Sequence, residues 1–413
     1  MGEFKLDFVC LDVIAVYMQK TIVRNTVAVS FALLTAALAA CSDDNAAPAG
    51  ADAGPDGAAT GGKGVDLTAA DPGKNGILVT LSGEDLASVG YDWTSSSLAD
   101  GDPPAFVEGW ALKFDHVLVT VGNLKLNADP DKDEGNPTSV GALVQSAAGP
   151  WVVDAARGGD VPGKSGSPDE KAVRLVSFTS KSDGAAFDTA SRYAFSYDFV
   201  APSASAKDVN LDAAGKALYA TAISKGWTMV YAGTATYKGP KPAAGSVFEK
   251  IPSVVKFTLG FANPSTYANC RNTDLQQVGG EFPRGLQTNA SGAITAQITL
   301  HTDHGFWDTL NVEGTPLHFD PIAAQADTST GIVTTDDLIS ADITGFKTRA
   351  GDTLTWRSAV SDYAAPAGQM KYNANGTSFS RANSLAAFLA YSAASGGHMN
   401  SDGECEVKNN YTP

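Results

Sequence analysis

Three of the chain's five histidines lie close together in the stretch ITLHTDHGFWDTLNVEGTPLHFD, residues 298–320. They are His301, His304 and His318, and carboxylate and aromatic side chains stand between them. Imidazole nitrogens are common ligands of zinc and copper, and three of them with a carboxylate or a water complete a frequent coordination set. The stretch therefore predicts a transition-metal site, although it matches neither the HExxH pattern of metalloproteases nor a zinc-finger spacing.

Strand alternation places part of this group on one face. Apolar and polar residues alternate in AITAQITLHTD (293–303), as in a β-strand with one buried face. His301 and Asp303 fall on the polar face, so we expect them to project together, away from the main core. Asp303 can then cap a short helix through HGFWDTL, with His304 in its first turn. His318 lies in TPLHFDP, where two prolines favour an extended segment that returns alongside.

A fourth histidine and two cysteines extend the candidate site. His398 lies in the Gly-rich segment SGGHMNSDGEC, seven residues before Cys405. In an exported protein, Cys270 and Cys405 are most simply a disulfide, which would tie this segment to the other histidines and make His398 a candidate fourth ligand. Free or metal-bound thiols are the alternative for the cysteines. Hydrogen-bonding structural roles and acid–base catalysis are the alternatives for the histidines.

The loop NADPDKDEGNP offers a second candidate site, rich in oxygen ligands. Asp129, Asp131 and Asp133 stand at alternate positions, as ligands 1, 3 and 5 of a calcium loop do. Glu134 occupies the place that the EF-hand pattern gives to glycine, and no glutamate stands at position 12. The segment predicts either a calcium site or a solvated acidic hairpin tip.

The N-terminal part of the chain carries the features of an export signal. From Met18 it reads MQKTIVRNTVAVSFALLTAALAAC, with a basic start, an apolar stretch and the ending Leu38-Ala39-Ala40-Cys41. This is the plan of a secretory signal peptide, and its ending resembles the lipobox of bacterial lipoproteins. The resemblance implies that Cys41 is acylated and becomes the first residue of the mature chain. The alternative, a membrane-spanning helix, needs about 20 apolar residues, more than this run contains.

The neighbouring segments are interpreted around this signal. Residues 1–17 contain three acidic residues that oppose export, and we interpret them as a misassigned start. Residues 18–40 are the signal peptide, and 41–75 are a flexible acidic tether rich in Ala, Gly, Asp and Pro. Ser42 follows the lipidated cysteine, which by analogy with the enterobacterial sorting rule favours the outer membrane, facing the periplasm or the exterior.

Period-two patterning dominates the rest of the chain. SRYAFSYDFV places four aromatic residues on one face, and VKFTLGFA repeats the pattern. Strands are also expected over 77–82, 110–127, 173–179 and 293–303, and helices over 212–226 and 381–395. We expect a mainly β protein with sandwich-like antiparallel sheets and a few short helices. The sandwich covers residues 76–262, and an irregular, disulfide-stapled region, 263–413, belongs to the same domain or forms a second one.

Charge and motifs exclude several classes of function. The formal net charge is -16 and no basic cluster is present, which argues against nucleic acid as a partner. GGDVPGKS (158–165) fits the phosphate-loop pattern, but Gly166 and Pro168 break the helix that must follow, so we expect no nucleotide binding. No GxSxG elbow is present.

The leading hypothesis is a lipid-anchored, non-enzymatic protein of the cell envelope that binds copper or zinc through its C-terminal histidines. An acidic surface would concentrate cations around such a site. One alternative is a structural or adhesive module that binds glycan or protein. Another is a metal-dependent hydrolase, which needs an open coordination position beside a cleft. The sequence assigns no catalytic residue.

Overall fold

The structure, a computed structural model, describes residues 62–94, 106–310, 316–341, 346–354, 357–358, 372–374, 377–379 and 384–411. The interpreted misassigned start, the signal peptide and Cys41 lie outside these residues, as does the tether up to residue 61. Those parts of the interpretation remain predictions.

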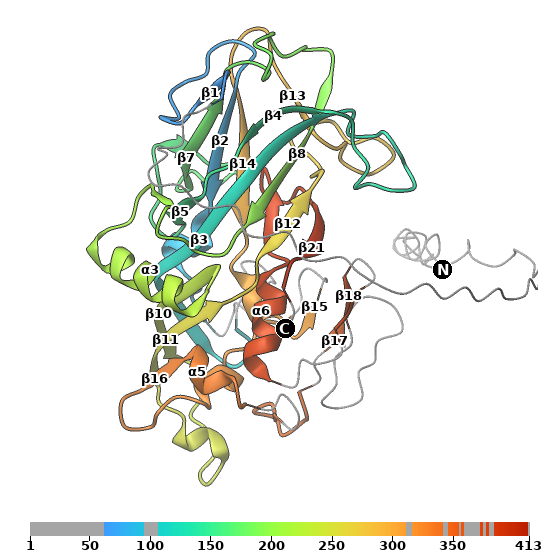
Figure 1. Cartoon of the computed structure of the whole chain (residues 1–413). Coiled ribbons are helices and arrows are strands. Elements are labelled where there is room, and N and C mark those ends of the chain that lie inside the picture. The colour runs from blue at the N-terminus through green and yellow to red at the C-terminus, as the bar shows by residue number, and fades with distance from the viewer. Residues whose placement is uncertain are drawn as a thin grey trace, which may run out of the picture. The chain divides into compact units, whose positions relative to one another are not determined.

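Two mixed sheets carry most of the described strands (Figure 1). The smaller one has six strands in the order β1-β7-β2-β14-β20, with β6 paired to β7. Their bounds are β1 (Val65–Asp66), β2 (Ile77–Ser82), β6 (Val161–Pro162), β7 (Lys171–Phe178), β14 (Ile294–Leu300) and β20 (Gly397–Met399).

The larger sheet has eleven strands, with β16-β11-β10-β3-β8-β12-β21 as its main path. Along that path lie β3 (Trp110–Ala128), β8 (Arg192–Phe199), β10 (Met229–Tyr237), β11 (Val254–Phe261), β12 (Ser265–Ala268), β16 (Ile332–Thr334) and β21 (Glu406–Asn409). The others are β4 (Leu143–Ala147), β5 (Trp151–Asp154), β9 (Lys207–Asp208) and β13 (Leu286–Gln287). Two short ladders pair β15 (Thr309–Leu310) with β17 (Arg357–Ser358), and β18 (Tyr372–Ala374) with β19 (Thr377–Phe379).

The predicted mainly β fold, with few short helices and a disulfide in its C-terminal region, is confirmed. Most described strand pairs are antiparallel, but β2 pairs in parallel with β14, β11 with β16, β5 with β9, and β15 with β17. Both sheets combine strands from either side of residue 262. Two of the parallel pairs, β2 with β14 and β11 with β16, join segments that lie far apart in the chain.

Alternation along β3 explains how the sheets pack. Val117, Val119 and Val121 are fully buried in a core to which strands of both sheets contribute, including β2, β7, β10 and β14. Leu118 points to the opposite face, where it packs with residues of α3. The long strand β3 crosses the centre of the view in Figure 1, with α3 on its outer side.

The described helices are short. They are α1 (Glu84–Val89), α3 (Ala213–Lys225), α4 (Asp320–Ala323), α5 (Thr335–Leu338), α6 (Leu385–Ala393) and the 3-10 helices η1 (Val247–Lys250) and η2 (Asp303–Phe306). Both predicted helices are present: Asp212 caps α3, and the Ser384 side chain caps α6 by accepting from Ala387 N. Among the helices described, none is long and apolar enough to span a membrane.

The disulfide lies next to β12 and β21, the last two strands in the order of the larger sheet. Cys270 follows β12 and Cys405 precedes β21, and these two strands pair antiparallel. The bond joins residues 135 positions apart, so it encloses β14, η2, α6 and β20 in a single covalent loop. The predicted pairing is confirmed, and the four candidate histidine ligands lie within that loop.

Candidate metal centre

Three histidine side chains meet at one end of β14. His301 follows this strand, His304 lies in η2, and His398 is the middle residue of β20. One ring nitrogen of each lies within 4.8 Å of the others. β20 pairs antiparallel with β14 and sets His398 opposite Thr299. Strand pairing thus brings the distant His398 to the two histidines of the sequence cluster.

The three rings lie close together, but not yet in the arrangement of a coordination site. The rings of His301 and His398 are stacked, with centroids 4.3 Å apart and planes at 11°. The ring of His304 stands across both, at 72° to His301 and 77° to His398. Nitrogen ligands of a tetrahedral zinc site lie about 3.4 Å apart, since each bond is about 2.0–2.1 Å. Because an ion lies in the plane of each ring that binds it, one of the stacked rings must tilt to complete the site.

The tautomer of His304 follows from its hydrogen bonds. Ser395 Oγ donates its only proton to the Ser392 carbonyl oxygen, at 2.7 Å. The same Oγ lies 2.9 Å from His304 Nδ1, so it must accept a proton from that nitrogen. Nε2 of His304 therefore carries a free lone pair. It is buried and has no hydrogen-bond partner among the described residues.

The ring nitrogens of His398 are also buried. Both its ring nitrogens are buried without a standard hydrogen bond to any residue that the structure describes, although the backbone near Ser395 and Asp402 weakly favours a proton on the ring. Buried polar atoms in native proteins nearly always have a partner. Unpaired nitrogens on both His304 and His398 therefore require an explanation, and a shared ligand supplies one.

Burial and charge set the protonation of the three rings. Burial lowers the pKa of His304 well below its ordinary value, and the charge on the other two rings lowers it further. Burial and the charge on His301 do the same to the pKa of His398. Burial also lowers the pKa of His301, but the Glu84 and Asp303 carboxylates raise it more, to about 9. His304 and His398 are thus neutral, the form in which imidazole binds a metal ion, whereas His301 is protonated at pH 7 and must release a proton when it becomes a ligand.

Carboxylates surround His301. Its Nε2 lies 3.5 Å from Glu84 Oε1 and 3.8 Å from Asp402 Oδ1. These three residues form a second group that could hold a cation, and Ser401 Oγ donates to Glu84 at 2.9 Å. If the other nitrogen of His301 takes the ion, Nε2 donates to Glu84, which is the carboxylate–histidine–metal arrangement common in proteins.

Asp303 acts on the site through Trp307. Trp307 Nε1 donates to Asp303 Oδ2 at 3.2 Å, and the indole stacks on the His304 ring with centroids 3.6 Å apart. Asp303 begins η2 and the N-cap is Thr302, one residue before the predicted cap. The polar face of β14 also differs from the expectation, because Gln297 and Thr299 are fully buried, with β2 and β20 on either side. Asp303 therefore orients the Trp307 indole against His304 and is not part of the histidine group itself.

The structure does not bring His318 into this group. Leu317 forms bridges with Phe106 and Trp307, so the segment does return alongside η2 as expected. The His318 ring, however, faces a different set of residues. Its Nδ1 is hydrogen-bonded to Glu108, and its Nε2 lies 3.4 Å from Asp308 Oδ2. His318 is thus held between two carboxylates.

The loop between α6 and β20 is held closely against the histidines. Ser392 Oγ in α6 donates to the His304 carbonyl oxygen, and His301 N donates to the Gly396 carbonyl oxygen at 2.8 Å. A Cβ on Gly396 would lie 2.5 Å from the His301 carbonyl oxygen, closer than real Cβ atoms come. Gly396 therefore permits the loop to reach the site.

A pocket of about 300 Å³ opens onto the histidine group. His304, His398 and Trp307 form one side, and Arg271 and Arg284 form part of the other. Both arginines are already paired, Arg271 with Glu281 at 2.8 Å and Arg284 with Glu406 at 2.6 Å. An ion bound by the three histidines would thus lie beside this pocket, which His304 and His398 line.

No protein-family model, curated protein or solved structure matches this chain. The assignment of a function therefore rests on the residues themselves.

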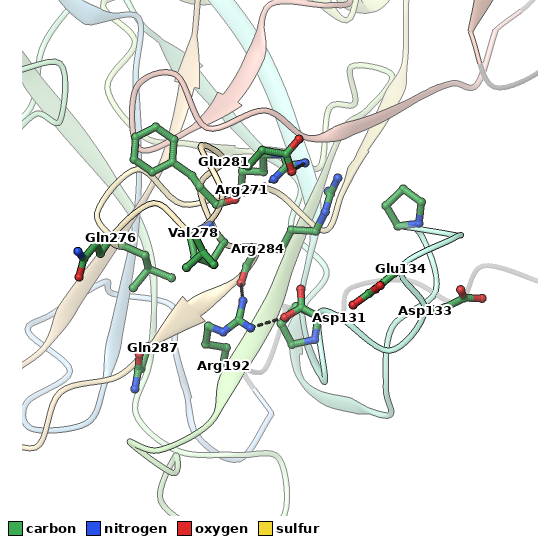
Figure 2. Close-up of a pocket in the computed structure, with 15 residues that line it drawn as sticks. Asp131, Asp133, Glu134, Arg192, Arg271, Gln276, Val278, Glu281, Arg284 and Gln287 are labelled. Carbon is green, nitrogen blue, oxygen red and sulfur yellow. Dashed lines mark hydrogen bonds and ion pairs between the residues drawn. The ribbon is translucent and has the colours of Figure 1, made fainter. Parts of the chain in front are cut away.

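The acidic loop lines a larger cavity of about 770 Å³, which shares Arg271 and Arg284 with the pocket over the histidines. Figure 2 shows the Asp131 carboxylate directed at Arg192, with which it forms an ion pair, whereas the Asp133 carboxylate points away from the arginines. Among the described residues, the groups able to hold an ion do not include the predicted set Asp129, Asp131 and Asp133. Calcium binding at this loop remains a prediction.

One further expectation, and two residues that the sequence analysis did not single out, can be placed in the structure. After the phosphate-loop look-alike, turns lead into the strand β7, and Lys164 pairs with Asp274 at 2.7 Å. Glu84 and Ser395, which hold His301 and His304, were missed by the sequence analysis. Nothing local to Glu84 marks it, because only the parallel pairing of β2 with β14 brings α1 near the site.

Proposed function

We propose that this protein binds one transition-metal ion, copper or zinc, through His301, His304 and His398. The observation that carries the proposal is the convergence of buried, unpaired ring nitrogens on His304 and His398. A purely structural histidine network predicts hydrogen-bond partners for these atoms, and burying them unpaired costs about 1–3 kcal/mol each. Ligation by an ion removes that cost and uses nitrogens as ligands that zinc and copper favour.

Metal content of protein purified without a histidine tag tests this proposal. After supplementation with copper or zinc and dialysis, the wild type should retain about one equivalent, measured by plasma mass spectrometry. The double variant His304→Ala/His398→Ala should retain less than about a tenth of that. His116→Ala is the matched control, because His116 lies in β3, is paired with Asp154 at 2.7 Å and is outside the group.

Two results would contradict the proposal. One is a wild type that retains less than about a tenth of an equivalent of either metal. The other is a double variant with unchanged metal content and a lowered melting temperature, which would assign the histidines a structural role.

We also propose that the chain is exported and anchored to the bacterial outer membrane through a lipid on Cys41. The support is the signal-peptide plan and the Leu38-Ala39-Ala40-Cys41 ending. Expression in a bacterium with radiolabelled palmitate should label the wild type and leave the Cys41→Ala variant unlabelled. A labelled Cys41→Ala variant, or an unlabelled wild type, would refute the anchor.

A metal-dependent hydrolase is the second candidate, favoured by the pocket over the histidines. Three protein ligands with a remaining open position are typical of catalytic zinc sites, whereas structural sites use four protein ligands. An ion there would lower the pKa of a bound water toward about 7 and polarise a substrate carbonyl or phosphoryl group. Zinc-supplemented wild type should then hydrolyse p-nitrophenyl acetate or bis(p-nitrophenyl) phosphate faster than His304→Ala/His398→Ala does. Equal rates would leave metal binding without catalysis.

A further inference from the structure

A third cavity is distinct from the pocket beside the histidine group and from the cavity that the acidic loop lines. It has a volume of about 720 Å³, within the range of about 300–1,000 Å³ usual for small-molecule sites. Tyr237 at the end of β10, Phe248 in η1, and the segment before β3 contribute to its walls. Its lining is rich in apolar side chains: Val107, Pro240, Pro242, Ala243, Tyr237 and Phe248. Neither the metal centre nor the disulfide borders it.

Unpaired polar atoms are concentrated in the residues that line this cavity. Trp93 Nε1, Ser246 Oγ, Thr348 Oγ1 and two nitrogens of Arg349 are buried without a hydrogen-bond partner among the described residues. The indole and guanidinium nitrogens can only donate, and the hydroxyl groups can donate as well. Such a set is complementary to a ligand that carries acceptor oxygens.

Arg349 is held rigidly in this wall. Its Nη2 donates to Asp320 Oδ1 at 2.6 Å, and Trp110 Nε1 donates to the same oxygen at 2.8 Å. The guanidinium lies 4.1 Å from the centre of the Tyr237 ring and 4.9 Å from that of Phe248. These contacts fix the planar group and leave Nε and Nη1 unpaired.

The charge of the lining favours an anion. Lys241, Lys347 and Arg349 line the cavity. Arg349 is paired with Asp320, and the carboxylate of Glu108, in the described lining, is paired with His318, so the two lysines carry the excess positive charge. This excess of positive charge is local, because the whole chain has a formal net charge of -16. A positive patch on an acidic protein attracts anions selectively to that place.

From these observations we propose that the cavity binds a small organic acid, with an apolar body against the aromatic and proline side chains and a carboxylate facing Arg349. The apolar walls account for the body of the ligand, and the unpaired donors account for its oxygens. Thr348 and Ser246 add hydroxyl donors to the same lining. This site is independent of the metal centre, so either proposal can fail without the other.

Isothermal titration calorimetry of the full chain tests the site with two acids, 2-naphthoate and octanoate, and their neutral amides. At least one acid should bind about tenfold or more tightly than its amide, since a charge-assisted contact to arginine distinguishes them. Arg349→Met keeps the apolar stem and should abolish that preference. Arg157→Met, which removes a surface arginine paired with Asp212, is the matched control and should leave it intact.

Two further variants keep the test decisive if Arg349→Met unfolds. Thr348→Val preserves shape and removes one unpaired hydroxyl, so it should weaken binding of the acid about two- to tenfold, the loss of one hydrogen bond. Trp93→Phe should remove most of the tryptophan fluorescence change on binding, which locates the ligand. Absence of binding by both acids, acid and amide of equal affinity, or unchanged affinity in Arg349→Met or Thr348→Val would overturn the proposal.

Discussion

Ser395 does not belong to the histidine group, yet it determines which nitrogen of His304 is free. Because its hydroxyl proton is given to the Ser392 carbonyl, Ser395 can only accept from Nδ1. Loss of such an outer partner typically weakens metal binding by about 10–100-fold. We predict that Ser395→Ala lowers the affinity for copper or zinc by that factor, measured by competition with a chromophoric chelator.

Ser224 provides a matched control for this substitution. In α3 its Oγ donates to the Thr221 carbonyl at 2.8 Å, the same contact that Ser395 makes three residues back. Ser224 is exposed and far from the histidines in the chain. Ser224→Ala should leave metal affinity unchanged, and an equal loss in both variants would show that Ser395 has no specific role.

The raised pKa of His318 leads us to predict that the stability of the fold depends on pH. Burial lowers the pKa of His318, but hydrogen bonds with Asp308 and Glu108 raise it more, to about 9. The folded state therefore favours the protonated ring relative to an unfolded value of about 6.5. The contribution of His318 to the free energy of unfolding, up to about 3 kcal/mol, is fully present below about pH 6.5 and is lost as the pH rises through 9.

Urea unfolding between pH 6 and 10 measures this effect. The wild type should lose stability over that interval, and His318→Gln should lose distinctly less, whatever its absolute stability. Some dependence will remain in the variant, because the pKa of His301 is also raised to about 9. A slope in His318→Gln as steep as that of the wild type would contradict the assignment.

At the scale of elements, the short loop from α6 to β20 determines whether the histidines meet. Gly396 lies against the His301 carbonyl oxygen, where a Cβ would come within 2.5 Å, and it would touch His304 Cβ at 3.4 Å. Gly396→Ala must therefore shift backbone, at a cost of about 1–3 kcal/mol. We predict that it lowers both the free energy of unfolding and the metal affinity.

Gly292 is the control at the element scale. A Cβ there would meet nothing within 4 Å, and like Gly396 it does not require a positive φ. Gly292→Ala should change the free energy of unfolding by less than about 1 kcal/mol. If Gly396→Ala were as well tolerated, the close contact in the loop would not constrain the site.

Features that depend on residues close together in the sequence could be predicted, and features that depend on residues far apart in the sequence could not. Alternation in β8 and β11 and the capping of α6 are local, so these elements were predictable. The grouping of His301 with His304 was predictable for the same reason. The position of His318, which is hydrogen-bonded to Glu108 and lies outside the histidine group, was not predictable, because it depends on a contact between residues 210 positions apart. The parallel pairing of β2 with β14, which brings Glu84 to His301, has no local signature either.

At the scale of the whole molecule, the disulfide and the metal act on stability by different routes. The Cys270–Cys405 bond closes a loop of 135 positions and restricts mainly the unfolded chain, worth up to about 5 kcal/mol in the chain-entropy model. A bound ion stabilises the folded state by mass action, about 2.7 kcal/mol at a free metal concentration of 100 times Kd. The two effects should therefore add.

We predict that Cys270→Ala/Cys405→Ala lowers the free energy of unfolding by about 2–5 kcal/mol, measured in urea without metal. Saturating zinc should then raise the stability of this variant by the same increment as in the wild type, because the folded geometry of the three histidines is retained. The increment should be absent in His304→Ala/His398→Ala. A disulfide variant that folds but gains nothing from zinc would mean that the bond holds the metal centre itself in shape, since Cys405 lines the same pocket as His398.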